Sequence, residues 1–164
     1  MGYFARNGGR KSTAIWGALV ERIQLEVIVH APAELVWNRL TDWPSQSEWM
    51  LGTKVSGTGA GVDGEISAFT GIGPIGFLDT MIITRWKPPY RCDVLHTGKV
   101  VKGTGSFIVE KINKNMSKFI WIEYLNIPLG FIGRLGFKLV RPLFVIGVQK
   151  SLDKFAKYVA EFSE

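Results

Sequence analysis

The stretch GIGPIGFLDTMIITRW, residues 71–86, contains a G-x-G-x-x-G spacing followed by a run of β-branched and aromatic residues. In a dinucleotide-binding motif such glycines end a strand and a helix follows, with its first N–H groups aimed at a pyrophosphate. Here Pro74 interrupts the glycines, and residues 79–86 have the composition of a strand. Because residues 64–70 are strand-like as well, the glycines are predicted to connect two strands, where positive φ or close backbone approach is needed.

Strand-like runs follow one another through the middle of the chain, with turn residues and no helix between them. After a first strand at 20–29, the predicted strands are 54–58, 64–70, 78–86, 90–97, 101–112 and 117–125. Connections this short join neighbouring strands antiparallel. We therefore expect a seven-stranded antiparallel sheet.

Helical patterns flank these strands. Pro32 lies near the first turn of a predicted helix that ends at Leu40, and a second short helix is expected to be capped by Asp42 and to end near Leu51. After Pro128, apolar residues recur at near-helical intervals up to the C terminus; they are Leu139, Leu143, Leu152, Phe155, Val159 and Phe162. The element order predicts an α+β domain in which a curved sheet wraps around a long C-terminal helix.

Composition limits the possible functions. A chain of 164 residues suits one domain, here expected at 20–164 after a flexible basic tail at 1–19. The single Cys92 excludes an intrachain disulfide and makes a reducing cytoplasm the default location. His30 and His96 are far apart, so we expect no metal site and no cofactor. The net charge of +6 is spread along the chain without a nucleic-acid-binding motif, and we expect no nucleic-acid partner.

Residues 129–148 are apolar enough to suggest a membrane span, but Arg134, Lys138 and Arg141 lie within them, which argues against a span. Pro142 predicts a kink, and the first part of the helix is expected to form a mobile gate. Its three cations could contact anionic membranes peripherally, or could simply be solvated. We expect a monomer or a weak dimer.

Eight short motifs follow one another along the chain: His30–Trp37, Thr41–Pro44, Glu48–Trp49, Trp86–Pro89, His96–Gly98, Gly103–Gly105, Trp121–Glu123 and Ser151–Leu152. In this order they resemble the START-like (SRPBCC) superfamily of polyketide cyclase/dehydrase, lipid-transport and coenzyme Q-binding proteins. The resemblance covers the chain from about Val20 to the end, and it implies a helix-grip fold with a cavity between sheet and helix. It implies binding or transport of a hydrophobic small molecule, lipid-like, isoprenoid or polyketide-like. A cyclase or dehydratase is the alternative, and a partner-binding domain without an essential ligand is a third possibility.

Alternation along the strands identifies candidate polar groups for such a cavity. His96 shares a face with Cys92 and Val94, and Glu123 shares a face with Trp121, which predicts that both point inward. Asp79 shares a face with Arg85 by the same rule. These groups could orient a ligand, with His96, Glu123 and Asp79 as weak catalytic candidates, or they could satisfy one another as core polar groups.

The predicted pocket has several hundred Å³, the ordinary size of a small-molecule site. Its predicted ligand-binding residues are Trp49, Phe69, Met81, Arg85, His96, Phe107, Trp121, Glu123 and Leu139.

Overall fold

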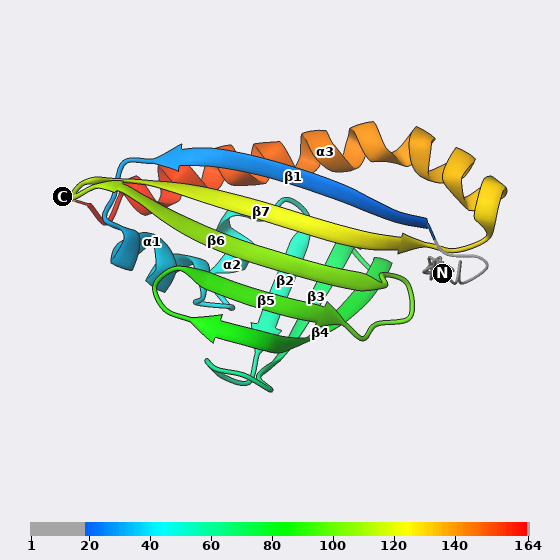
Figure 1. Ribbon diagram of the computed structural model, residues 1–164, viewed down its shortest axis with the longest axis horizontal. Helices are drawn as coiled ribbons and strands as arrows, with labels where there is room; N and C mark the ends of the chain where they lie inside the picture. Colours follow the sequence, from blue (N-terminus) through cyan, green and yellow to red (C-terminus); the bar gives the residue numbers. More distant parts are fainter. Residues whose placement is uncertain (1–18, 164) are drawn as a thin grey trace, which may run out of the picture.

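The computed structural model describes residues 19–163, so all but the last residue of the expected N-terminal tail lies outside the described part (Figure 1). The elements are β1 (Leu19–Val29), α1 (Ala33–Leu40), α2 (Gln46–Trp49), β2 (Thr53–Gly57), β3 (Glu65–Ile72), β4 (Ile75–Lys87), β5 (Arg91–His96), β6 (Gly103–Asn113), β7 (Met116–Ile127) and α3 (Gly130–Ala160). The fold has the expected element order.

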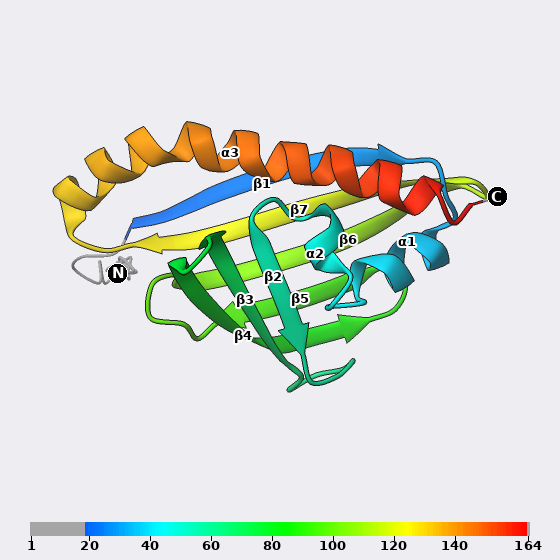
Figure 2. The same ribbon diagram turned by 180° about the vertical axis from the view of Figure 1, so that it is seen from behind.

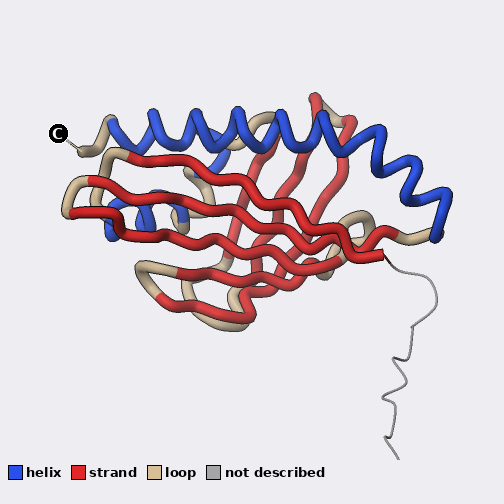
Figure 3. The backbone as a smooth tube through the Cα atoms, turned by 45° about the horizontal axis from the view of Figure 1, so that its top comes forward, coloured by secondary structure: helices blue, strands red, loops and turns tan. Residues whose placement is uncertain are grey.

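The seven strands form one antiparallel sheet in the order β1-β7-β6-β5-β4-β3-β2. Helix α3 runs along one side of this sheet over almost its whole length (Figure 2). Figure 3 shows that β2, β3 and the first part of β4 run at a steep angle to β1 and β7, so the sheet is sharply curved. The predicted α+β helix-grip architecture is confirmed.

The glycine-rich stretch is the turn between β3 and β4. Gly71 pairs with Gly76 and Ile72 with Ile75, which leaves Gly73 and Pro74 as a two-residue loop. Gly73 has a φ of +59°, which glycine adopts without strain. A Cβ at Gly71 would lie 2.2 Å from the carbonyl oxygen of Ile75, so the two strands approach too closely there for any side chain.

One prediction about the helices is wrong in detail. Helix α2 begins at Gln46, and Asp42 does not cap it: the backbone carbonyl of Asp42 accepts hydrogen bonds from the amide and hydroxyl of Ser45. Helix α3 continues from Gly130 to Ala160 with Pro142 inside it, because the missing proline N–H removes only one bond of a long series. The kink expected at Pro142 and the mobile gate stay predictions.

The two halves of α3 have different surroundings. Leu152, Phe155 and Val159 in its second half are fully buried. The ring of Phe155 lies 4.7 Å from that of Trp49 in α2 and 5.3 Å from that of Phe119 in β7. These contacts fix the second half on the sheet, while most side chains from residue 132 to 146 in the first half are exposed.

None of the helices within residues 19–163 has the length and apolar character needed to cross a bilayer.

Candidate functional site

A cavity of about 540 Å³ lies between the inner face of the sheet and α3. Its walls come mostly from alternate residues of β2 to β7 and from one face of α3, so the side chains that point inward from a curved sheet supply most of the lining. Apolar examples are Ile66, Met81, Val94, Phe107, Trp121, Leu125, Phe144 and Val148. The space has the size and the mainly apolar walls of a small-molecule site.

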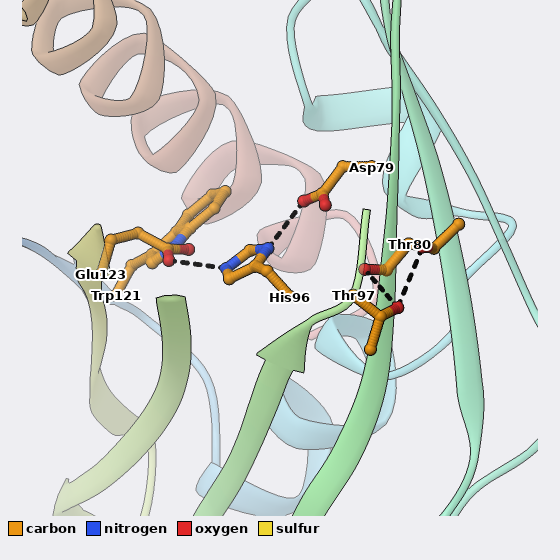
Figure 4. A network of polar contacts seen from close by, with 6 residues as sticks. All are labelled: Asp79, Thr80, His96, Thr97, Trp121 and Glu123. Carbon is orange, nitrogen blue, oxygen red and sulfur yellow. Dashed lines mark hydrogen bonds and ion pairs between the residues drawn. The ribbon is translucent and has the colours of Figure 1, made fainter. Parts of the chain in front are cut away.

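One buried polar cluster stands in this apolar wall (Figure 4). His96 of β5 lies between two carboxylates: its Nδ1 is 2.7 Å from Oδ2 of Asp79 in β4, and its Nε2 is 3.0 Å from Oε2 of Glu123 in β7. The indole N–H of Trp121 donates to Oε1 of Glu123 at 2.6 Å. All four residues line the cavity, and each is at least nine-tenths buried.

The cluster sets the charge of His96. Burial lowers the pKa of His96, but the hydrogen bonds to Asp79 and Glu123 and the charges of both carboxylates together outweigh burial and raise it from 6.5 to about 9. His96 is therefore an imidazolium at neutral pH, and each of its N–H groups donates to one carboxylate. An imidazolium whose two N–H groups are both engaged has no lone pair ready to accept a proton from a ligand.

Two glycines leave room for the carboxylates. A Cβ at Gly105 would lie 3.0 Å from Oε1 of Glu123, and a Cβ at Gly98 would lie 2.9 Å from Oδ1 of Asp79. This Oδ1 is buried without a hydrogen-bond partner among the described residues. Gly98 in the His96–Gly98 motif and Gly105 in the Gly103–Gly105 motif thus provide the space that the two carboxylates of the polar cluster occupy.

Five of the predicted ligand-binding residues line the cavity. They are Met81, His96, Phe107, Trp121 and Glu123. Asp79, a catalytic candidate, lines it as well. Strand alternation placed these side chains correctly, because their strands are regular where they border the cavity.

Arg85 does not line the cavity, because β4 carries an irregularity. Ile83 pairs with Val94, whereas Arg85 pairs with Asp93, so one extra residue of β4 is inserted between them. The insertion reverses the alternation and turns Arg85 outward, where its guanidinium lies 3.3 Å from the carboxylate of Asp93. The predicted shared face of Asp79 and Arg85 is therefore wrong.

Three further predicted residues lie away from the lining. Trp49 is fully buried in the core against Phe155. Phe69 belongs to the opposite face of β3 from Ala68, which does line the cavity. Leu139 is exposed, because it lies about 160° around α3 from Phe155 at 100° per residue.

Most of the helical part of the lining was not among the predicted residues. Phe137, Val140, Phe144, Gly147 and Val148 of α3 all face the cavity. Extending the buried face of Phe155 backward in steps of three, four or seven residues would have found most of them.

Clusters of three or more His, Cys, Asp or Glu with metal-site geometry are absent from residues 19–163. The single thiol is not activated either: burial, and to a lesser extent the charge of Asp93, raises the pKa of Cys92 to about 12.

We expect native Cys92 to resist alkylation. At about pH 8 almost no thiolate forms at a pKa this high, so iodoacetamide should modify the urea-unfolded protein much faster than the native one. Mass spectrometry of the intact protein measures both rates. Equal rates would contradict the assigned environment of the thiol.

Comparison with known proteins yields structural neighbours only; neither a protein-family model nor a curated sequence matches the chain. The aromatase/cyclase ZhuI from Streptomyces sp. R1128 superposes with a TM-score of 0.71 at 15% identity, over 87% of this chain and 94% of that one. Norcoclaurine synthase from Thalictrum flavum, in complex with dopamine and hydroxybenzaldehyde, gives 0.67 at 16% identity over 99% of both chains. A START superfamily protein from Mycobacterium smegmatis gives 0.67 at 13% identity, over 84% of this chain and 98% of that one.

These likenesses show that the chain has the START-like (SRPBCC) helix-grip fold that its motifs resemble. At identities this low the likeness establishes the fold alone, since one fold supports many functions.

Proposed function

We propose that the protein binds and carries a hydrophobic small molecule, lipid-like, isoprenoid or polyketide-like, in the cavity between the sheet and α3. One observation carries the proposal: the cavity of about 540 Å³ has mainly apolar walls, and most polar atoms of its buried cluster are hydrogen-bonded to one another. Such walls stabilise an apolar ligand by removing its surface from water, by roughly 25 cal/mol per Å² buried. The polar cluster determines the orientation of the bound ligand more than the affinity of the protein for it.

A bulky side chain in the cavity tests the proposal. Gly147 lines the cavity, and a Cβ there meets no atom within 4 Å, so Gly147→Trp should place an indole in the ligand space without a backbone clash. We expect this variant to bind the uncharged probe N-phenyl-1-naphthylamine at least about tenfold more weakly, by probe fluorescence and quenching of tryptophan emission.

Gly136→Trp is the matched control, because Gly136 also has open space at its Cβ but does not line the cavity. It should bind the probe as the wild type does. Equal affinity in Gly147→Trp and the wild type would mean that the probe binds elsewhere, and the carrier proposal would fail. If Gly147→Trp weakens probe binding as expected, mass spectrometry of molecules that copurify with the native protein would identify the natural ligand class.

A cyclase or dehydratase is the second candidate, favoured by the position of His96, Asp79 and Glu123 at the cavity wall. It requires a bound substrate to displace one carboxylate and free a ring nitrogen for proton transfer. Turnover of a polyketide-like substrate that is lost in His96→Gln, with substrate binding retained, would favour this candidate over the carrier.

Arg134, Lys138 and Arg141 are exposed on α3. Their peripheral contact with an anionic membrane stays a prediction, as do the monomeric or weakly dimeric state and the cytoplasmic location.

A further inference from the structure

The mouth of the cavity is marked by residues that both line it and are exposed. They are Leu51, Phe77, Val100, Lys102, Asn126, Pro128, Val140 and Leu143. Large apolar side chains predominate in this set, although water would normally favour polar side chains at an open rim. The opening is thus bordered by apolar side chains from five separate parts of the chain, at Leu51, Phe77, Val100, Pro128 and the pair Val140 and Leu143.

Exposed apolar side chains continue outward from this mouth. Beside the β3–β4 turn, Ile72 ends β3 and Ile75 begins β4, and they are 88% and 81% exposed. The same strand ends carry Thr70 and Phe77, which line the cavity. On α3 an exposed stripe falls within about 80° of the helix circumference at 100° per residue; it consists of Ile132, Leu135, Leu139, Leu143 and Ile146. Figure 2 shows the first half of α3 and the linked ends of β3 and β4 in the same half of the molecule.

The segments that form this surface carry charges of one sign. Residues 66–78, 97–104 and 124–152, which supply the turn, the loop after β5 and the first half of α3, contain no Asp or Glu. The loop contributes the exposed Lys99 and Lys102, and α3 contributes Arg134, Lys138 and Arg141. An apolar surface whose own segments carry only cations complements a layer of anionic headgroups above hydrocarbon.

We propose that this apolar rim, made of the β3–β4 turn, Val100 and the outward stripe of α3, docks on an anionic lipid bilayer and opens the cavity directly to it. The inference rests on the proposed function, because it assigns the source of the ligand that the cavity holds. A second copy of the chain fits less well: in a two-fold contact α3 would face its own symmetry mate and bring like charges together. A ligand that leaves the bilayer through this mouth does not cross water.

Flotation of the full-length protein with vesicles tests the docking. We expect binding to phosphatidylcholine vesicles that contain phosphatidylglycerol, and much weaker binding to pure phosphatidylcholine. Leu139→Glu should weaken binding to the anionic vesicles by at least about tenfold, since it replaces a leucine that would enter the bilayer by a charge that the headgroups repel. Ile75→Glu, on the turn, should act in the same direction.

Val62→Glu is the matched control. Val62 is exposed by 56%, compared with 74% for Leu139, but it lies in the loop before β3 and not at the mouth. It should leave vesicle binding unchanged. Replacing Arg134, Lys138 and Arg141 together with glutamine should weaken binding to the anionic vesicles by about a hundredfold at low salt, with little effect on binding to neutral ones.

Failure to float with either type of vesicle, or equal flotation of Leu139→Glu and wild type, would overturn the docking proposal. A wild-type dimer that Leu139→Glu dissociates, without vesicle binding, would assign the rim to a second copy instead. Leu139 and Ile75 do not line the cavity, so their variants should bind N-phenyl-1-naphthylamine normally in solution. Probe binding without flotation ends the docking proposal alone, whereas flotation without probe binding in the cavity ends the carrier proposal.

Discussion

Replacing His96 with leucine is expected to lower the free energy of unfolding by about 3–5 kcal/mol, a value typical of a buried ion pair that loses one partner. The substitution leaves the carboxylates of Asp79 and Glu123 buried, each without the N–H group that it faces in the native protein. Urea unfolding followed by circular dichroism measures the loss.

His30→Leu is the control for this variant, because the same residue type is exposed at the end of β1. It should change stability by less than about 0.5 kcal/mol. A triple variant, with Asp79→Asn and Glu123→Gln added to His96→Leu, removes both carboxylate charges and should recover part of the loss. A loss of less than about 1 kcal/mol in His96→Leu would mean that the cluster is hydrated in solution, in contrast to the buried network described above.

The stability of the wild-type protein should fall as the pH rises from about 6.5 to about 9. The folded protein holds the pKa of His96 near 9, above the ordinary value of 6.5, so the native state binds the proton more tightly than the unfolded chain does. The stabilisation is complete below pH 6.5 and is lost as the pH passes through 9, with a total change of about 3 kcal/mol.

Unfolding curves at a series of pH values measure this change, and the His96→Gln variant should lack it. The imidazole C–H resonances of His96 give its pKa independently. Stability that stays constant or increases over this interval would show that His96 is not held as the imidazolium between two carboxylates.

The sheet was predictable from the sequence because its signals are local. Turn residues separate the strands, and the connections are too short to permit parallel pairing. The inward direction of His96 and Glu123 followed from simple alternation, and both lie where the strands are regular. The placement of Asp79 and Glu123 at opposite nitrogens of the His96 ring could not be predicted, because it depends on the register and curvature of four strands.

The wrong assignments have equally specific causes. Arg85 follows an inserted residue in β4 that no feature of the sequence indicates. One inserted residue turns every later side chain of the strand to the opposite face of the sheet. Leu139 belongs to the apolar pattern of the helix, and this pattern predicts a position facing the sheet, whereas the residue is exposed. The first half of α3 is apolar on two opposite sides, and periodicity alone cannot tell which side the sheet covers.

The strand order affects how the chain can fold during synthesis. β1 lies at the edge of the sheet and pairs with β7, so Leu19 has to meet Ile127 and Val29 has to meet Ser117. While the ribosome produces the residues between them, β1 has no neighbouring strand, and α3, which also packs on β1, follows all seven strands in the sequence. The amphipathic strand β1 therefore emerges long before its partners, and the nascent chain has to keep it from pairing with other edges until β7 and α3 have been translated.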